Sequence, residues 1–292
     1  MLLAVLIAVF ISVMSRKTTD LNCYTFNATS IKGKLHEFNS HFHGAQAEFD
    51  CIAVQETWLS DEIYDGEILF NSDYNIFRRD RNALTSSKST GGGVMLAIAS
   101  HLSCTRREDL ETALEIIWLQ VKLDDANSAF VGNVYLPPDS KLDALELLEE
   151  SLDKLSRAKK VNDSVIIFGD FNMRYIKWTP SGDGYANIDN PYDLPSLNSR
   201  FVEIVNSFEL VQHNVQPTCN GNQLDLVLTN KLDAVVNVTD KATTSTHDAL
   251  EVHVSLNVDS KKRDSSTSKR TVYNFKRADW DSVFLALLHL LG

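Results

Sequence analysis

The sequence has few of the residues that define disulfide-bonded, fibrous or disordered proteins. Its 292 residues include only 4 Cys, 6 Pro and 12 Gly, and no apolar run reaches the roughly 20 residues of a membrane-spanning helix. The four cysteines are scattered, which excludes a disulfide framework and suits a reduced compartment. None shows C-x-x-C spacing, which argues against structural zinc. With 43% hydrophobic residues, the chain is too apolar to be disordered. One large domain or two small ones remain possible.

Positive charge is also scarce over most of the chain. The net charge is −11, residues 1–260 carry −15, and the short stretch 261–277 carries +6. An acidic body repels nucleic acid at long range unless metal ions or local arginines reverse the field where contact occurs. The charge distribution therefore argues against a passive DNA-binding module.

The two ends of the chain differ from its body. Residues 1–19 begin with 14 almost wholly apolar residues without a basic region before them, so their status is uncertain and a membrane anchor is a minor alternative. Residues 259–272 are polar and basic, as in a linker, and residues 273–292 begin an amphipathic helical region. That region stops without a partner, which suggests a truncated piece of something longer. Residues 20–258 form the expected domain.

Within this domain, short apolar runs alternate with amphipathic segments. The amphipathic segments predict three helices: Ser140 to Leu155, capped by Asp139 or Ser140, and two others around residues 35–42 and 201–208. This alternation predicts an α/β fold whose sheet faces are covered by helices. The apolar runs predict eight strands: Leu21–Phe26, Cys51–Val54, Val94–Ala99, Ile116–Val121, Ala129–Tyr135, Val165–Phe168, Leu224–Leu228 and Leu250–Leu256.

Polar residues that carry chemistry stand at the ends of several predicted strands. Asp170 and Asn172 follow Val165–Phe168, and Glu56 follows Cys51–Val54. Taken singly, each has an ordinary explanation, because Gly, Asp and Asn are common in turns and a Glu at a strand end is usually solvated.

Four further residues occupy similar positions. Asn27 and Tyr135 each end a predicted strand, with an Asx-turn and a packed aromatic as their ordinary explanations. Asp225 lies within an apolar run, where a buried carboxylate needs a partner, and His247, which precedes the last strand, could be that partner. A phosphodiester hydrolase needs carboxylates for a hard divalent ion, amides and hydroxyls for phosphate, and an oriented His or Asp for protons. Each of these parts is present.

The strings around these residues resemble the endonuclease/exonuclease/phosphatase superfamily, and within it the apurinic-type endonuclease domain of non-LTR (LINE-like) retrotransposons. The resemblance covers about residues 20–258, and no polymerase Asp-Asp motif is present. Its specific strings are Gln55-Glu56-Thr57-Trp58-Leu59, Phe77 to Arg81 followed by Gly91 to Val94, Tyr135-Leu136-Pro137-Pro138, Gly169-Asp170-Phe171-Asn172, Gln216-Pro217-Thr218 and Leu224 to Asn230.

The resemblance implies a four-layer sandwich of two packed β-sheets flanked by helices, as in DNase I, with a site at one edge. It implies Mg²⁺, with Mn²⁺ possible, near Glu56, Asn27 and Asp170. The implied catalytic roles are phosphate contact by Tyr135, water activation by Asp170, and phosphate or nucleophile binding by Asn172. Asp225 is implied to orient His247, which faces the phosphate.

One position departs from the family pattern. Relatives usually have Ser-Asp-His at the last site strand, whereas this chain has Ser245-Thr246-His247. Asp248 is a poor substitute, because it lies roughly 6 to 7 Å further along a strand. Weaker metal binding is therefore expected, with a catalytically decayed remnant as an alternative.

The same resemblance, with the acidic body, places DNA phosphates near Arg78, Arg79, Arg81 and Thr218, although the arginines could equally form a solvated turn. Gly91 to Gly93 lacks the Lys-Ser/Thr of a P-loop and predicts a hairpin or close strand packing.

The sequence thus predicts a metal-dependent endonuclease, monomeric and without a small-molecule cofactor, that nicks DNA to give a 3′-hydroxyl primer for a reverse transcriptase. Alternatives of the same fold are an abasic-site repair nuclease or another phosphoesterase. An intracellular, nuclear location follows from the resemblance, and the basic stretch 261–270 is weakly compatible with nuclear import.

Overall fold

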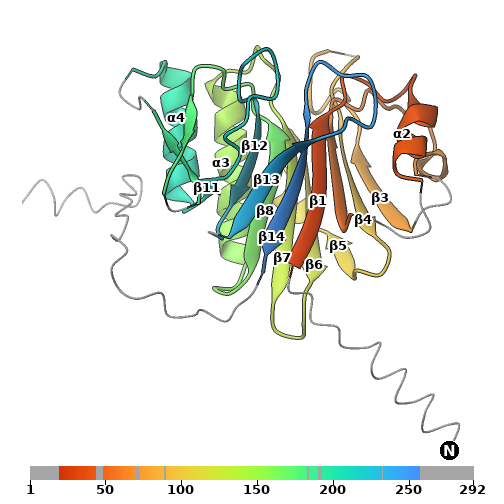
Figure 1. Ribbon diagram of the computed structural model, residues 1–292, viewed down its shortest axis with the longest axis horizontal. Helices are drawn as coiled ribbons and strands as arrows, with labels where there is room; N and C mark the ends of the chain where they lie inside the picture. The colour runs from red at the N-terminus through yellow and green to blue at the C-terminus, as the bar shows by residue number, and fades with distance from the viewer. Residues whose placement is uncertain are drawn as a thin grey trace, which may run out of the picture.

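The structure is a computed structural model that describes residues 20–256 apart from 44–48, 70–72, 89, 183, 190–192 and 232. The predicted segments 1–19, 259–272 and 273–292 lie outside the described residues. Two six-stranded mixed sheets pack face to face, and helices cover their outer faces (Figure 1). No helix among the described residues is long and apolar enough to cross a bilayer.

The first sheet has the strand order β13-β14-β1-β2-β4-β3. Its only parallel pair is β1 with β2, aligned so that Asn27 lies opposite Gln55. The strands, in chain order, are β1 (Asp20–Asn27), β2 (Cys51–Gln55), β3 (Tyr74–Arg79), β4 (Val94–Ala99), β13 (Ala234–Thr239) and β14 (Ala249–Ser255).

The second sheet has the order β11-β12-β8-β7-β6-β5, and β7 with β8 is its parallel pair. A separate two-stranded ribbon is formed by β9 (Trp178–Pro180) and β10 (Ala186–Ile188). The strands of the second sheet are β5 (Cys104–Arg106), β6 (Glu115–Lys122), β7 (Ser128–Tyr135), β8 (Ser164–Asp170), β11 (Val211–Gln212) and β12 (Asp225–Thr229).

Three apolar clusters separate the layers. Residues of both sheets, such as Leu96 and Phe168, form the cluster between them. The outer face of the first sheet packs against Phe38 of α2 (Leu35–His41), and that of the second against α3 (Leu142–Ala158) and α4 (Ser196–Ser207). Two short 3₁₀ helices, η1 (Asp65–Glu67) and η2 (Glu108–Leu110), complete the elements. The predicted four-layer α/β sandwich is confirmed.

The start of α3 corrects one detail of the sequence prediction. Lys141 is the N-cap residue and no side chain caps the helix, although Asp139 and Ser140 are nearby. Asp139 instead pairs with Lys88, at 2.9 Å between Oδ2 and Nζ. The leucine spacing predicts a buried stripe from Leu142 to Leu155; Leu145, Leu148, Leu152 and Leu155 are buried, but Leu142 in the first turn is 50% exposed. Packing on the sheet rather than a cap therefore fixes this helix.

All eight predicted strands and three predicted helices are present, whereas β3, β5, β9, β10, β11 and β13 were not predicted. Both unpredicted strands of the first sheet, β3 and β13, are its edges. Their side chains are largely half-buried or exposed, and an edge strand carries less of the apolar pattern from which strands are predicted.

Candidate active site

The strand register of the second sheet brings three of the predicted residues together. Parallel pairing of β7 with β8 places Tyr135 opposite Asp170, and antiparallel pairing of β12 with β8 places Asp225 opposite the same Asp170. All three side chains are buried, with 1% of Asp170 and 2% of Asp225 exposed. Tyr135 and Asp170 are 35 positions apart in the sequence, and Tyr135 and Asp225 are 90 positions apart. The strand register therefore brings distant residues together at one end of this sheet.

Asn27 joins this group to the first sheet. Its side-chain Nδ2 donates hydrogen bonds to Glu56 Oε1 and to Asp170 Oδ2, both at 2.8 Å. Its Oδ1 accepts the backbone N–H of Thr29 at 2.9 Å. Asn27 therefore supports both carboxylates through its amide nitrogen, while its oxygen is occupied by the backbone.

Glu56 is held in an unusual backbone conformation. Its φ is 49° and that of Trp58 is 55°, both in the left-handed region that non-glycine residues seldom adopt. The glycine-rich loop holds this turn, because Gly93 O accepts the Thr57 N–H at 3.1 Å and Gly92 O accepts the Trp58 N–H at 2.9 Å. Backbone strain of this kind clusters at functional sites.

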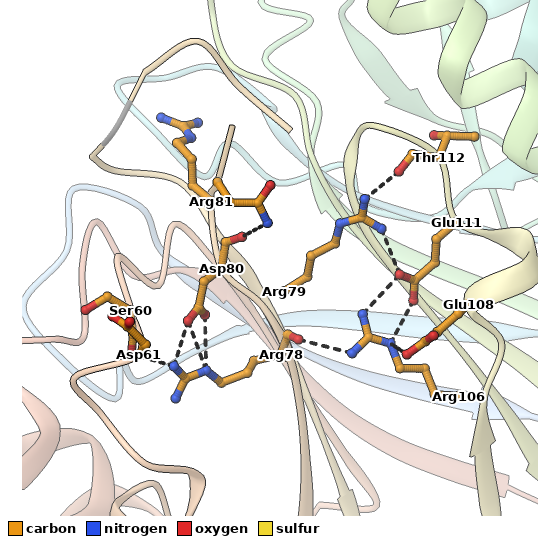
Figure 2. A pocket seen from close by; sticks show the side chains of 11 residues that line it. Ser60, Asp61, Arg78, Arg79, Asp80, Arg81, Arg106, Glu108, Glu111 and Thr112 are labelled. Carbon is orange, nitrogen blue, oxygen red and sulfur yellow. Dashed lines mark hydrogen bonds and ion pairs between the residues drawn. The ribbon is translucent and has the colours of Figure 1, made fainter. Parts of the chain in front are cut away.

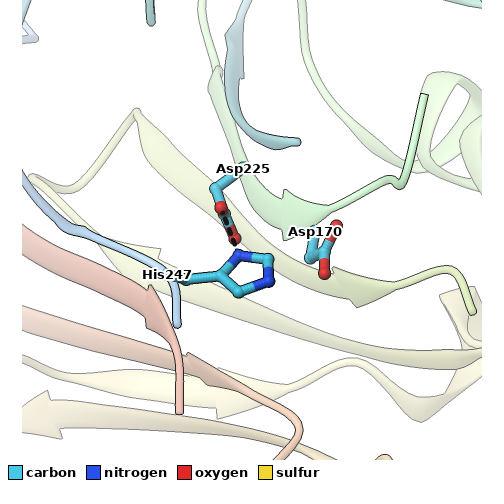
Figure 3. A group of neighbouring side chains, drawn as sticks. All are labelled: Asp170, Asp225 and His247. Atoms are coloured by element: carbon cyan, nitrogen blue, oxygen red, sulfur yellow. Dashed lines mark hydrogen bonds and ion pairs between the residues drawn. The ribbon is translucent and has the colours of Figure 1, made fainter. Parts of the chain in front are cut away.

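His247 is held by Asp225. Its Nδ1 lies 2.7 Å from Asp225 Oδ2, and only 7% of His247 is exposed. Asp170 lies on the other side of the imidazole (Figure 3). A carboxylate on Nδ1 fixes the ring orientation and favours a tautomer with the proton on that nitrogen. The other ring nitrogen, Nε2, therefore remains available for catalysis.

The buried charges shift the proton affinities of the site. Burial and the nearby Asp225 raise the pKa of Asp170 well above its ordinary value, although His247 and Asn27 oppose the shift. Burial lowers the pKa of His247, but the hydrogen bond and charge of Asp225 outweigh it, so the net pKa of His247 is raised. Perturbed pairs of this kind are typical of acid–base sites.

Tyr135 and Asn172 complete the predicted group. Burial, followed by the charges of Glu56 and Asp170, raises the pKa of Tyr135, so its hydroxyl remains a proton donor. Asn172 donates its backbone N–H to Asp170 Oδ1 at 3.0 Å and its Nδ2 to Leu136 O at 2.8 Å. Asn172 therefore fixes Asp170 and ties the end of β8 to the residue that follows β7.

The residues present fit a divalent cation. Asp170, Asp225 and His247 offer ligand atoms that all lie within 4.8 Å of one another, and Asp225 Oδ1 is buried without a hydrogen-bond partner among the described residues. Two buried carboxylates this close repel each other unless a proton or a cation intervenes. Glu56 adds a third carboxylate on the Asn27 side. Oxygen donors of this kind suit a hard cation such as Mg²⁺.

Thr246 is exposed beside His247. Its hydroxyl hydrogen bonds to the Cys219 thiol, an interaction that lowers the pKa of Cys219 against a larger increase from burial. Asp248 forms an ion pair with Lys241, at 3.3 Å. Asp248 therefore serves a surface contact, as its spacing from Thr246 predicts.

The three arginines proposed for DNA contact are all ion-paired, and Figure 2 shows the pairs of Arg78 and Arg79. Arg78 pairs with Asp80 at 2.6 Å, Arg79 with Glu111 at 2.7 Å, and Arg81 with Glu115 at 2.5 Å. They line a surface cavity of about 790 Å³ together with Arg106, which also binds Glu111. The carboxylates in and beside this cavity neutralise its arginines, which weakens the case for it as a phosphate site.

Thr218 is buried, with 1% exposed. Its Oγ1 accepts the backbone N–H groups of Leu224 and Asp225, at 3.3 and 3.2 Å, and its carbonyl oxygen accepts the N–H of Asp248 at 2.8 Å. Thr218 thus holds the start of β12 and the segment that carries His247. These contacts support the site from inside the protein.

Sequence reasoning missed Glu115, which is buried at the start of β6 with 3% exposed. Its Oε2 accepts the Gly93 N–H at 2.8 Å, and its Oε1 binds Arg81. A charged residue directly before the apolar Ile116-Ile117-Trp118 was the available signal.

The fold is a four-layer α/β sandwich with a group of carboxylates, amides, an imidazole and a phenol at one end of its sheets. The family model described as "Endonuclease-reverse transcriptase" matches residues 129–251, a range that includes Tyr135, Asp170, Asn172, Asp225 and His247. The predicted resemblance is confirmed. No curated protein sequence matches the chain.

Three solved structures share the fold at low sequence identity. The endonuclease domain of TRAS1, a telomere-specific non-LTR retrotransposon, is 14% identical with a TM-score of 0.55, and the match covers 81% of this chain and 99% of that one. AP endonuclease LMAP from Leishmania major is 16% identical with a TM-score of 0.60, covering 84% and 90%. An AP endonuclease from Archaeoglobus fulgidus is 17% identical with a TM-score of 0.52, covering 80% and 99%.

Proposed function

We propose that this protein is a Mg²⁺-dependent endonuclease that nicks one DNA strand and leaves a 3′-hydroxyl to prime reverse transcription. The observation that carries the proposal is the convergence at Asn27, whose one amide group hydrogen bonds to both Glu56 and Asp170. On the far side of Asp170 lies the Asp225–His247 pair. The match to the endonuclease-reverse transcriptase family supports the retroelement substrate over others of the same fold.

In this proposal, Glu56 and Asp170 hold the cation, and Asn27 keeps their carboxylates in place. When bound, Mg²⁺ supplies positive charge that neutralises the scissile phosphate. The −15 charge of residues 1–260 repels an anionic substrate, and such a cation offsets this repulsion at the site.

The remaining residues handle protons and phosphate. Asp170, with its raised pKa, accepts a proton from the attacking water. His247, whose pKa Asp225 raises against the effect of burial, donates a hydrogen bond or proton to a phosphate oxygen through Nε2. Tyr135 donates its hydroxyl to the phosphate, and Asn172 positions Asp170 and the nucleophile. The enzyme acts as a monomer in the nucleus, with DNA and a reverse transcriptase as partners and no small-molecule cofactor.

A supercoiled-plasmid nicking assay with Mg²⁺, or with Mn²⁺, tests the proposal. We expect the wild type to convert plasmid to the open-circular form, and Asp170→Ala and His247→Ala to lose the activity by at least about 10²-fold. Asp248→Ala and His253→Ala are matched controls, because both residues make surface contacts, Asp248 with Lys241 and His253 with Asn22. They should retain activity.

Ligation or polymerase extension of the nick checks for the 3′-hydroxyl. Cleavage confined to a duplex with an abasic site would instead identify a repair nuclease. Release of phosphate from an inositol polyphosphate without DNA cleavage would identify another phosphoesterase. A folded wild type without any of these activities would identify a decayed remnant.

A further inference from the structure

The side chain of Arg81 is largely covered by the protein, although the residue lines the edge of the surface cavity and sequence reasoning placed it at the DNA. Its side chain is 7% exposed, and its Nε lies 2.5 Å from Glu115 Oε1. Nη1 donates to Thr90 O at 3.0 Å. Figure 2 shows its side chain apart from the ion pairs of Arg78, Arg79 and Arg106. A guanidinium whose Nε is paired with a buried carboxylate in this way is poorly placed to bind a DNA phosphate.

Through Glu115, Arg81 reaches the turn that carries Glu56. Glu115 Oε2 accepts the Gly93 N–H at 2.8 Å, and Gly93 O accepts the Thr57 N–H at 3.1 Å. These links are short and continuous. They hold the glycine loop against the turn in which Glu56 has its positive φ of 49°.

Arg81 also faces Tyr135. Its guanidinium carbon lies 5.8 Å from the centre of the Tyr135 ring, and its Nη2 is buried without a hydrogen-bond partner among the described residues. A guanidinium over an aromatic face is attracted by the ring, more strongly where water is excluded. The positive charge of Arg81 also opposes the increase in the pKa of Tyr135 that burial and the carboxylates cause.

Gly92 is the residue that makes room for this arrangement. A Cβ at Gly92 would lie 2.3 to 2.5 Å from Nη2, Cζ and Nε of Arg81, which is closer than atoms can approach. At Gly91, which also has a positive φ, the nearest atom would be Arg81 Nη1 at 3.4 Å. The glycine motif therefore serves Arg81 and the turn at once.

We propose that Arg81 is a positioning residue, which holds Glu56 through Glu115 and Gly93 and holds the Tyr135 ring by direct contact. The proposal rests on the proposed function, since it assigns Arg81 to the same site. The proposal predicts that Arg81 affects the rate of cleavage and not the affinity for DNA. Arg78 and Arg79 have other partners: they pair with Asp80 and Glu111, whereas Glu115, the partner of Arg81, also accepts the Gly93 N–H.

Arg81→Lys and Arg81→Gln test the proposal in the nicking assay. We expect kcat to fall about 10- to 100-fold and the half-saturating Mg²⁺ concentration to rise, because small displacements of Glu56 and Tyr135 are costly. The KM for DNA and the salt dependence of DNA binding in EDTA should not change, whereas loss of one phosphate contact lowers the salt slope by about 1. A normal kcat in Arg81→Lys and Arg81→Gln, or a reduced salt slope with normal kcat, would overturn the proposal.

Arg107→Lys and Arg107→Gln are the matched controls. Arg107 also lies over an aromatic ring, 5.6 Å from the centre of Phe130, and pairs with Asp109 at 2.7 Å. Phe130 and Tyr135 are five residues apart on β7, or roughly 17 Å. The Arg107 variants should keep wild-type kcat. A loss as large as in the Arg81 variants would show a general stability effect and overturn the proposal.

Gly92→Ala and Gly91→Ala test the same contact without removing the arginine. Both add a methyl group at a positive φ, but only Gly92→Ala displaces Arg81, so only Gly92→Ala should reproduce the Arg81 defect. Hydrogen exchange of residues 57–59 and 93 supplies a readout that is independent of activity: exchange should increase in Arg81→Lys and Gly92→Ala, and not in Arg107→Lys. If the wild type does not nick DNA, the proposed function fails while this measurement still decides the positioning role. Equal exchange in all variants would overturn it.

Discussion

Asp225 and His247 are joined by a hydrogen bond of 2.7 Å between Oδ2 and Nδ1. Asp225 begins β12 of the second sheet, and His247 precedes β14 of the first. The bond therefore links the two sheets at the end where Asn27, the last residue of β1 in the first sheet, donates to Asp170 of β8 in the second. Two connections between separate sheets make the site sensitive to small changes in the packing of one sheet on the other.

Asp225→Asn should shift the whole pH profile of nicking to lower pH. The charge of Asp225 raises the pKa of both Asp170 and His247, so its removal lowers both. Asp170 acts in its ionised form, so the nicking rate rises with pH as Asp170 loses its proton. With a lower pKa of Asp170, this rise occurs at lower pH. His247 acts in its protonated form, so the nicking rate falls as His247 loses its proton. With a lower pKa of His247, this fall also occurs at lower pH. The rate at neutral pH should fall about 10- to 100-fold.

The measurement for Asp225→Asn is the rate of nicking from pH 5 to pH 10 at saturating Mg²⁺, the range chosen to span both limbs. Asp248→Asn is the control, since Asp248 pairs with Lys241, and its profile should match the wild type. If the limbs of Asp225→Asn stayed in place, other groups would be titrating.

Thr218→Val should reduce both stability and nicking. The change removes Oγ1, the acceptor for the N–H groups of Leu224 and Asp225, and buried donors left without a partner cost about 1–3 kcal/mol. Asp225 then shifts away from His247. Urea denaturation gives the free energy of unfolding, and filter binding in EDTA gives the affinity for DNA.

Thr218→Ser keeps the hydroxyl and should stay within about 1 kcal/mol of the wild type. The affinity for DNA should be the same in both Thr218 variants. A drop in affinity with normal stability would return Thr218 to the DNA-contacting role that the sequence suggested.

Thr246→Asp should lower the Mg²⁺ concentration needed for half-maximal nicking. Thr246 is exposed next to His247 and contacts Cys219, so a carboxylate here adds a negative charge at the edge of the site. Thr244→Asp is the matched control, because Thr244 is also exposed and lies two residues earlier. Equal half-saturation in all three proteins would show that position 246 does not influence the cation.

Mg²⁺ should raise the thermal unfolding midpoint of the wild type, because a cation bound only by the folded state stabilises it. The increase should be smaller in Glu56→Gln, which keeps the size of the side chain but removes a carboxylate from the Asn27 contact. EDTA should reverse the increase. Glu62→Gln, at an exposed ion pair with Lys32, should respond like the wild type, and an undiminished response in Glu56→Gln would remove Glu56 from the cation site.

Local sequence patterns predicted the buried strands and all three helices correctly, because each of them shows a clear apolar periodicity. They failed at the edge strands β3 and β13, which have mixed burial. They also failed at the start of α3, where Asp139 turns to Lys88 instead of capping the helix. In both cases, partners distant in the sequence outweigh the local preference.

The candidate site also contains residues that the sequence predicted and residues whose role it did not predict. Glu56, Asp170 and His247 were predicted because they lie at strand ends and within motifs of the family that the sequence resembles. The structure places all three in one cluster of side chains. The role of the arginines could not be predicted, because the sequence does not show whether an arginine faces DNA or a buried carboxylate. The ion pair of Arg81 with Glu115 joins residues 34 positions apart, and only the packed sheets bring them together.

By itself, the sequence determined which segments form buried strands and which side chains can bind a cation or move a proton, since both depend on residue type and near neighbours. The tertiary structure alone decided that Asn27 donates to two carboxylates, that Asp225 orients His247, that Arg81 pairs with Glu115, and that Thr218 is buried. These outcomes depend on strand register and on the packing of one sheet against the other, which fix distances between atoms that the chain itself leaves far apart.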